Sequence, residues 1–264
     1  MTIAPLSGKH VVITRPIEQA GKLAALVKAA GGTPEFFPLI TIVPLQDEDK
    51  WTSGQEALKD ADWLIFISSN AVQYGLPRIR DYFGEIPANL RFAAIGPVTA
   101  AALEAEGIQH VLTPQDRFDS EALLALPEMH AVNGQKIVIV RGVGGRELLA
   151  ETLTSRGAKV DFAECYQRIN PQQDTGFVDG LWQNGQLDAV VVTSSEAMRH
   201  LFELAQDALK KDKPMSWIKN TYMCVNHARI AELPKQYGLK VSIAAAPGDA
   251  AMLQCLTDAV GNRK

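Results

Sequence analysis

The sequence predicts an α/β protein built of two similar doubly wound parallel-sheet domains that are joined by a two-stranded extended hinge. Three observations predict this fold. Residues 12–71 reappear without gaps as residues 138–197, short β-branched runs alternate with helical spacing, and each repeat carries one long extended stretch. An internal repeat constrains the architecture before any other pattern is weighed.

The repeat preserves polar positions as well as apolar ones. At an offset of 126 residues the identical pairs include Arg15/Arg141, Ser68/Ser194 and Ser69/Ser195, beside core pairs such as Val12/Val138. Two matching polar rims are therefore expected, and rims that face each other would form a cleft.

Composition sets the class of protein. The 264 residues are 47% hydrophobic and 21% charged, with a net charge of −4, which suits a folded chain of two domains. No run of Lys and Arg indicates nucleic-acid binding. No apolar stretch is long enough for a membrane span, and no secretion signal is evident, so we expect a cytoplasmic protein. The three widely spaced cysteines suggest no disulfide framework.

The expected elements alternate along the chain. Each short apolar run is followed by a turn and then by apolar spacing of three and four, the pattern of a parallel sheet with crossover helices. The strands are expected at residues 10–14, 62–68, 91–96, 110–114, 136–142, 159–166, 188–194, 221–226 and 240–245. The helices are expected to begin near Glu18, Asn70, Pro97, Ser120, Arg146, Phe177, Glu196, His227 and Asp249.

Two extended stretches complicate a simple tandem arrangement. Residues 33–45 (TPEFFPLITIVPL) and 159–171 (KVDFAECYQRINP) occupy the same relative position in the two repeats, and each is longer than a usual strand. One interpretation is two domains in tandem, divided near residue 134. The alternative is that these stretches connect the domains, with the chain crossing from one to the other and later returning.

Ligands of open α/β sheets bind at the carboxyl ends of the strands, where helix N-termini present backbone N–H groups. In this chain the turns at those ends are rich in glycine and small polar residues, which suits a phosphate or carboxylate ligand. The candidate binding residues are Arg15, Ser68, Ser69, Asn70, Gly96, Thr99, Arg141, Gly142, Gly144, Ser194 and Ser195.

Each signal has a structural alternative. The serines are also good helix caps, and the two arginines are also suited to pair with nearby carboxylates. Cys224 and His227 have the spacing of metal ligands, but no second pair completes a tetrahedral set, so no metal site is expected. The sequence shows no nucleophile motif, which favours chemistry that depends on positioning a reactive substrate.

The order and spacing of several segments carry a family resemblance. VVITRP, DWLIFISSNAV, AAIGPVTAAALEAEG, SEALLALP, KIVIVRGVGGRELLAETLTSRGAKVDFAECYQR and DAVVVTSSEAM together resemble uroporphyrinogen-III synthases, from about residue 10 to residue 255. The segment VNHARIAEL is a looser match.

The resemblance implies a lyase, a cyclising hydro-lyase of heme biosynthesis. Such an enzyme converts linear hydroxymethylbilane to uroporphyrinogen III, with loss of water and inversion of ring D, and it uses no metal or organic cofactor. The resemblance also implies flavodoxin-like domains. Domain one would comprise residues 1–36 plus 170–264, domain two residues 41–165, and residues 37–40 and 166–169 would be the hinge connectors.

The resemblance further implies roles for single residues and partners. Tyr166 matches the family's tyrosine, whose protonated hydroxyl would assist departure of the substrate hydroxyl, and Thr99 would contact a carboxylate. The only expected ligand is the linear tetrapyrrole, with no nucleic acid and no membrane. We expect a monomer that transiently contacts the preceding pathway enzyme.

Two other classes of protein share parts of this pattern. A noncatalytic two-lobed small-anion-binding protein would have the same duplicated design, but it would bind ligand without forming product. A nucleotide-sugar glycosyltransferase would have two α/β domains, but this chain is short for one.

Overall fold

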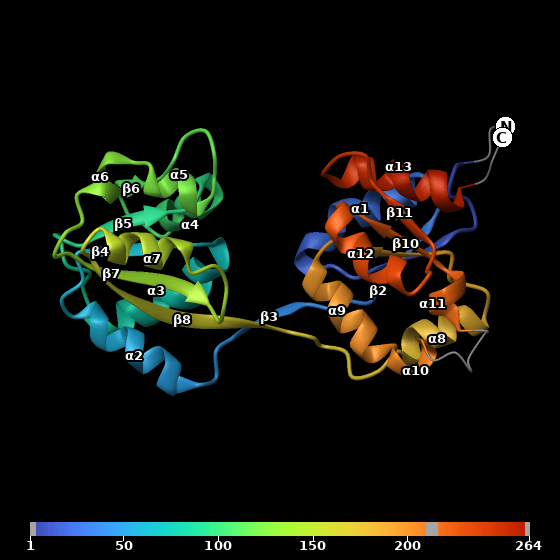
Figure 1. Ribbon diagram of the computed structural model, residues 1–264, viewed down its shortest axis with the longest axis horizontal. Helices are drawn as coiled ribbons and strands as arrows, with labels where there is room; N and C mark the ends of the chain where they lie inside the picture. Colours follow the sequence, from blue (N-terminus) through green and yellow to red (C-terminus); the bar gives the residue numbers. More distant parts are fainter. Residues whose placement is uncertain (1–3, 210–215, 262–264) are drawn as a thin grey trace. The chain divides into compact units, whose positions relative to one another are not determined.

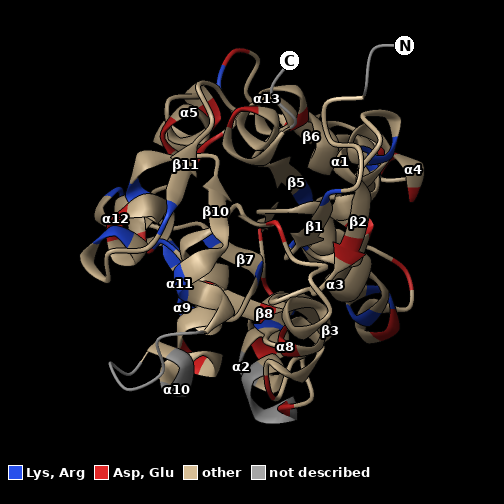
Figure 2. Ribbon diagram, turned by 90° about the vertical axis from the view of Figure 1, so that its right-hand side faces the viewer, with Lys and Arg blue, Asp and Glu red and all other residues tan. Residues whose placement is uncertain are grey.

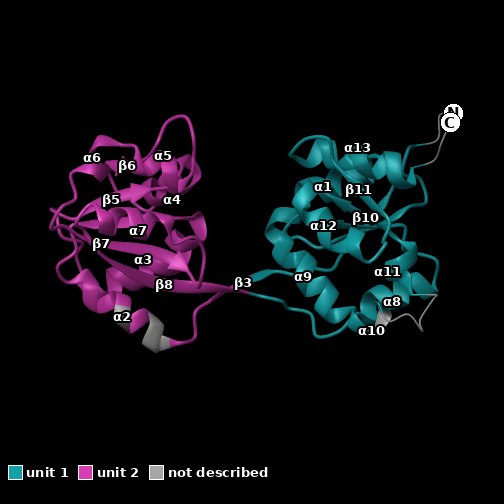
Figure 3. Ribbon diagram, viewed as in Figure 1, with its two compact units in different colours: residues 1–41, 169–264 teal, residues 42–168 magenta. Residues whose placement is uncertain are grey.

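The computed structural model describes residues 4–209 and 216–261. The chain divides into two compact units, Met1–Thr41 with Ile169–Lys264 (unit 1) and Ile42–Arg168 (unit 2) (Figure 3). The chain passes from one unit to the other twice, so unit 1 is discontinuous in sequence.

Unit 1 contains a parallel sheet. Its strands are β1 (His10–Ile13), β2 (Thr33–Phe36), β9 (Ala189–Val192), β10 (Tyr222–Val225) and β11 (Val241–Ile243). They lie in the order β11-β10-β9-β1-β2, and each neighbouring pair is parallel. Counted along the unit, this is the order 2-1-3-4-5 of the flavodoxin-like fold.

Unit 2 has the same design with a different chain order. Its strands are β3 (Thr41–Pro44), β4 (Trp63–Phe66), β5 (Arg91–Ala94), β6 (Val111–Leu112), β7 (Lys136–Gly142) and β8 (Lys159–Ile169), in the order β3-β8-β7-β4-β5-β6. The pairs from β8 to β6 are parallel. The prediction of two similar doubly wound parallel sheets is confirmed.

The two repeats exchange their first strand pairs. At the offset of 126 residues β7 corresponds to β1 and β8 to β2, while β9 corresponds to β4. Unit 1 joins β1 and β2 of the first repeat to β9, β10 and β11 of the second, and unit 2 joins β7 and β8 to β4, β5 and β6. Each unit is therefore assembled from both repeats.

Helices cover both faces of the sheet in unit 1 (Figure 1). Side chains of α8, α9, α11 and α12 pack with one set of strand residues, and those of α1 and α13 pack with the alternate set, as expected for strands whose side chains alternate between faces. The helices are α1 (Ile17–Ala29), α8 (Gly176–Gln183), α9 (Ser195–Leu204), α10 (Gln206–Leu209), α11 (Trp217–Asn220), α12 (Ala228–Gln236) and α13 (Asp249–Val260).

Unit 2 is layered in the same way. Side chains of α2, α3 and α4 pack on one face of its sheet, and those of α5, α6 and α7 pack on the other. The helices are α2 (Glu48–Leu58), α3 (Ser69–Phe83), α4 (Pro97–Ala105), α5 (Ser120–Leu124), α6 (Pro127–His130) and α7 (Leu148–Ser155).

The connector residues differ from the prediction. In the stretch 37–40, Phe37, Leu39 and Ile40 are buried in the core of unit 1 with side chains of α8 and α9. Tyr166, predicted to belong to the second connector, lies within β8 and in the core of unit 2. Burial of apolar side chains at these positions stabilises the fold. These residues therefore belong to the cores of the units and not to exposed connectors.

Charged residues lie mainly on helices and loops (Figure 2). The central strands β1, β4, β9 and β10 contain no Asp, Glu, Lys or Arg. No helix among the described residues is long and apolar enough to cross a membrane.

Candidate active site

Tyr166, within β8, and Ser68, just after the carboxyl end of β4, come together in unit 2. The Tyr166 side chain lies in the core, with the residue only 1% exposed, and its hydroxyl is 3.1 Å from Ser68 Oγ. The ring of Tyr74 lies beside it, with the ring centroids 6.2 Å apart. This arrangement places a buried phenol behind a half-buried hydroxyl.

Gly142 allows this placement of the tyrosine. The pairing of β7 with β8 shifts register between Arg141 and Gly142, which sets Gly142 opposite Tyr166. A Cβ atom at position 142 would lie 2.4 Å from Tyr166 Cε2 and 2.6 Å from Cζ. Gly142 is thus required by the ring that packs on it, a role that the glycine-rich turn pattern did not indicate.

The repeated serines begin equivalent helices in the two units. The Ala71 N–H donates to Ser68 Oγ at 3.1 Å at the start of α3, and the Ala197 N–H donates to Ser194 Oγ at 3.0 Å at the start of α9. Capping, the structural alternative, therefore describes both residues, and Ser68 contacts Tyr166 in addition. The neighbouring Ser69 and Ser195 are the first residues of these helices, and Asn70 is the second residue of α3.

The turn after β5 leads into α4. Gly96 is the N-cap of this nine-residue helix, and Pro97 occupies its first position, where the missing N–H costs no hydrogen bond. Thr99 is buried, with 6% of its surface exposed, while Val98 is 73% exposed. Phe118 packs against Gly96, since a Cβ there would lie 2.9 Å from Phe118 Cβ.

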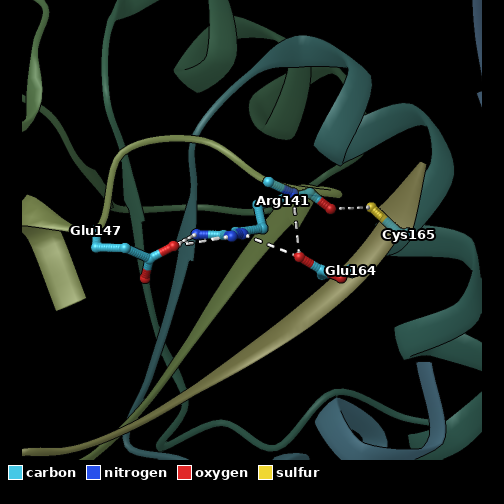
Figure 4. A network of polar contacts seen from close by, with 5 residues as sticks. Arg141, Glu147, Glu164 and Cys165 are labelled. Atoms are coloured by element: carbon cyan, nitrogen blue, oxygen red, sulfur yellow. Dashed lines mark hydrogen bonds and ion pairs between the residues drawn. The ribbon is translucent and has the colours of Figure 1, made fainter. Parts of the chain in front are cut away.

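Arg141 lies in a network of carboxylates (Figure 4). Its Nη1 and Nη2 each donate to Glu147 Oε1 at 3.2 Å, and its Nε donates to Glu164 Oε1 at 3.3 Å. The guanidinium also lies over the Phe162 ring, 4.0 Å from the centroid. The Cys165 thiol, whose pKa burial raises to about 12, donates to the Arg141 carbonyl. Arg141 therefore braces β7, β8 and the turn before α7.

The loop between Arg141 and α7 contains two glycines in backbone conformations that other residues rarely adopt. Gly144 and Gly145 have φ values of 73° and 120°, in the region that favours glycine. The Gly144 N–H donates to Glu164 Oε1 at 3.3 Å. No atom lies within 4 Å of a Cβ built on either glycine, so this loop is accessible to a ligand.

Arg15 is the equivalent arginine of unit 1. Its Nη1 donates to Asp249 Oδ1 at 2.5 Å, and its Nε donates to Thr193 Oγ1 at 3.3 Å. Both charged side chains are 14% exposed. In each unit the repeated arginine thus pairs with nearby carboxylates, the alternative considered from the sequence, but its partners differ. The first repeat has Gly21 and Pro38 where the second has the two glutamates that bind Arg141.

A pocket of about 270 Å³ lies beside Arg141 within unit 2. It lies at the carboxyl ends of β4, β5 and β7, on the face of the sheet that α5 and α7 cover. The walls are mostly apolar, and the polar residues come from the end of β7, the start of α5 and the loop before α7. The lining residues are Ile67, Ile95, Asp119, Ser120, Ile139, Arg141, Gly144, Gly145, Arg146, Leu149 and Phe162.

The predicted binding residues divide between the two units. Unit 1 contains Arg15, Ser194 and Ser195, and unit 2 contains Ser68, Ser69, Asn70, Gly96, Thr99, Arg141, Gly142, Gly144 and Tyr166. All but Tyr166, which lies within β8, are at the carboxyl ends of strands or in the turns and first helical residues that follow them. Sequence reasoning missed Asp249, Glu147 and Glu164, because their pairing with the arginines depends on tertiary packing. It also missed Ser120, which lines the pocket with Arg141.

The Cys224 and His227 pair forms no metal site in the structure. Cys224 is buried in β10, whereas His227 is exposed and its Nδ1 accepts the Arg229 N–H as the cap of α12. Within residues 4–209 and 216–261, no group of three or more His, Cys, Asp or Glu residues could hold a metal ion.

The fold and the site define a class of protein. Doubly wound α/β proteins bind small molecules at the carboxyl ends of their strands, and here those ends present backbone amides, hydroxyls and open glycine turns. The chain therefore belongs to the doubly wound α/β proteins, whose strand-end turns suit small-molecule binding.

Comparisons with known proteins specify the family. A family profile described as "Uroporphyrinogen-III synthase HemD" matches residues 21–254. The uroporphyrinogen-III synthase of Escherichia coli K12 is 34% identical over 228 residues, 86% of this chain and 91% of that protein. The enzyme of Salmonella typhimurium LT2 is 33% identical over the same shares of both chains. The chain belongs to the uroporphyrinogen-III synthase family.

Solved structures agree on the fold. A mutant uroporphyrinogen III synthase from the extremely thermophilic bacterium Thermus thermophilus matches with a TM-score of 0.58 at 17% identity, over 96% of this chain and 98% of that one. Uroporphyrinogen-III synthetase from Helicobacter pylori 26695 matches with a TM-score of 0.53 at 14% identity, over 93% and 97%.

Proposed function

We propose that this chain is a lyase that converts hydroxymethylbilane to uroporphyrinogen III, with ring closure, inversion of ring D and loss of water. The observation that carries the proposal is the family match over residues 21–254, which includes every predicted site residue except Arg15. The paired hydroxyls of Tyr166 and Ser68, on a buried edge of unit 2, support it chemically.

Departure of the substrate hydroxyl needs a proton. Tyr166 supplies it, and because Tyr166 is nearly buried while Ser68 is half-buried, the proton passes through Ser68. Ser68 Oγ already accepts the Ala71 N–H, which fixes the orientation of its hydroxyl. As Ser68 gives its proton to the leaving oxygen, it accepts the proton of Tyr166, and the product of this step is water.

The remaining steps depend on positioning. Loss of water leaves an azafulvenium carbon, which is attacked at the substituted position of the terminal ring, and the resulting spiro intermediate fragments and recloses. The protein favours this route by holding the carboxylate arms, so that closure without inversion is disfavoured. Within unit 2, the amides of the turns 96–99 and 142–146 and of the serine turn at the start of α3 hold carboxylate arms.

The two arginines support these turns. The guanidinium groups of Arg15 and Arg141 are engaged by carboxylates of the protein itself. Their role is therefore to fix the turns that present amides to the substrate, with Arg141 and Gly144 both bound to Glu164.

A monomeric state and transient contact with the preceding enzyme remain predictions, which sedimentation of the chain with and without that enzyme would test.

The test is incubation with freshly prepared hydroxymethylbilane, followed by oxidation and separation of the type I and type III isomers. Without enzyme the substrate closes to the type I isomer, so we expect the type III isomer to form only with the protein. If only the type I isomer forms, or if the protein binds the tetrapyrrole without turnover, the proposal is wrong.

A further inference from the structure

The duplication allows corresponding positions of the two units to be compared. Helix α13 packs beside α1 in unit 1, and α5 packs beside α7 in unit 2. Since α7 corresponds to α1 at the repeat offset, α5 occupies the place of α13, and its first residue, Ser120, corresponds to Asp249.

This correspondence shows where the units differ. In unit 1, Asp249 forms a 2.5 Å ion pair with Arg15, which joins the end of β1 to the start of α13. In unit 2 the same two positions are Arg141 and Ser120. The guanidinium of Arg141 is held by Glu147 and Glu164 instead, and both Arg141 and Ser120 line the pocket. The pocket lies where unit 1 has an ion pair.

The chemistry of the pocket selects its occupant. Three isoleucines, Leu149 and the Phe162 ring form walls that favour an apolar or aromatic body. The volume of about 270 Å³ is just below the usual range of about 300–1,000 Å³ for ligand pockets, so it suits a single ring rather than a whole tetrapyrrole.

The rim of the pocket carries an acidic and a basic side chain, and the basic one suits an anionic edge. The Asp119 carboxylate is already held by Arg117 and the Ala122 N–H. The open loop at Gly144 and Gly145 brings backbone close to the rim. The Arg146 side chain is 75% exposed, and its ion pair with Glu121 is long, at 3.5 Å. Such an exposed pair is weak, so Arg146 is available to a carboxylate of a ligand.

We propose that this pocket of unit 2 binds one pyrrole ring of the linear tetrapyrrole, with the ring against the apolar walls and its carboxylate arms at the loop 144–146. The proposal rests on the proposed function, because it assigns a subsite to that substrate. The pocket holds one ring of the substrate, and the other strand-end turns hold the carboxylate arms of the other rings.

The first experiment uses the unaltered protein with methyl-labelled isoleucine. The probe is a monopyrrole that carries one acetate and one propionate arm. We expect its addition to shift the methyl resonances of Ile67, Ile95 and Ile139 and to leave those of Ile13 and Ile218, in the core of unit 1, unmoved. Absence of shifts at the three pocket isoleucines, or equal shifts in unit 1, overturns the proposal.

The second experiment fills the pocket. Ser120→Phe should raise KM for hydroxymethylbilane about tenfold, since burial of one ring is worth at least that factor. Ala125→Phe is the matched control, because Ala125 is exposed at the end of the same short helix and does not line the pocket, and its KM should stay unchanged.

A third variant allows the proposal to be tested even if Ser120→Phe does not fold. Ser120→Asp introduces the carboxylate that unit 1 has at this position, and it should also raise KM. Unchanged KM in a folded variant overturns the proposal. If the unaltered protein forms no type III isomer, the proposed function fails. If it forms that isomer but the pocket resonances and KM do not respond, the pocket assignment fails alone.

Discussion

Gly142→Ala tests the packing that positions Tyr166. A Cβ at this position lies 2.4 Å from Tyr166 Cε2, and ordinary contact begins at 3.4 Å, so the ring must move by about 1 Å. Tyr166 is 1% exposed, so its ring can move only against neighbouring core side chains. Overpacking costs about 1–3 kcal/mol, and loss of the hydrogen bond to Ser68 costs about 0.5–1.5 kcal/mol. The free energy of unfolding should fall by about 2–4 kcal/mol.

Urea denaturation and single-turnover formation of the type III isomer measure the two consequences. Gly180→Ala is the control, since no atom lies within 4 Å of a Cβ in α8 and helix propensity favours alanine by up to about 1 kcal/mol. In a Tyr166→Phe background the ring still collides, but no hydrogen bond remains to be lost, so Gly142→Ala should cost less stability and cause no further loss of rate. A Gly142→Ala protein with unaltered stability and turnover would refute the reasoning.

Three further predictions follow from side-chain contacts. Asp119 caps α5, and the hydrogen bond from the Ala122 N–H, with the nearby Arg117 guanidinium, holds the pKa of its carboxyl below the usual range. Its contribution is present above the unfolded pKa and is lost as the pH falls through the lowered folded value, so Asp119→Ala should lower Tm at pH 7 and not in strong acid. An equal difference at both pH values would contradict this. Asp249→Asn weakens a pair whose side chains are 14% exposed and should cost about 1–3 kcal/mol by urea denaturation, whereas Glu203→Gln, in an exposed pair, should cost less than about 0.5 kcal/mol. Equal losses would argue against the bracing role. The hydrogen bond with Cys224 lowers the pKa of Cys255, whereas burial raises the pKa of Cys165, so iodoacetamide at about pH 8 should modify Cys255 before Cys165, as mass spectrometry can follow. Earlier labelling of Cys165 would contradict this order.

Strands in the middle of the sheets were predictable from their composition. The runs that form β1, β4, β7, β9 and β10 consist mostly of apolar residues that are buried on both faces, and the sequence indicated each of them. The sequence predicted one long extended stretch where the structure has two strands, β2 and β3, which contain Pro34 and Pro44. Both lie at sheet edges, where proline is tolerated and the strand pattern is weak.

Helix α2 was not predicted, because its sequence is a poor helix former. Gly54 lies in its interior, and the helix forms because Trp51 and Leu58 pack into the core of unit 2. A Cβ at Gly54 would lie 2.4 Å from the Phe162 carbonyl oxygen, so the glycine permits close approach of the helix to β8. Tertiary packing of this kind is invisible to local propensity.

The candidate site was predicted in place but only partly in role. The carboxyl-end rule located the turns that contain Ser68 and Gly142, because it depends only on the order of strands and helices. It did not show that the Tyr166 ring makes Gly142 necessary, or that Glu147 and Glu164 engage Arg141. Comparison of the repeats contained a signal for the latter, since the first repeat lacks both glutamates.

The central claim is that Tyr166 delivers a proton through Ser68 during formation of the type III isomer. The most direct measurement is the single-turnover rate of Tyr166→Phe, with Tyr74→Phe as the control, because Tyr74 is a neighbouring tyrosine whose hydroxyl donates to the Ile42 carbonyl instead. We predict a loss of about 100-fold for Tyr166→Phe, the lower range for a general acid, and little change for Tyr74→Phe. An unaltered rate for Tyr166→Phe would contradict the account.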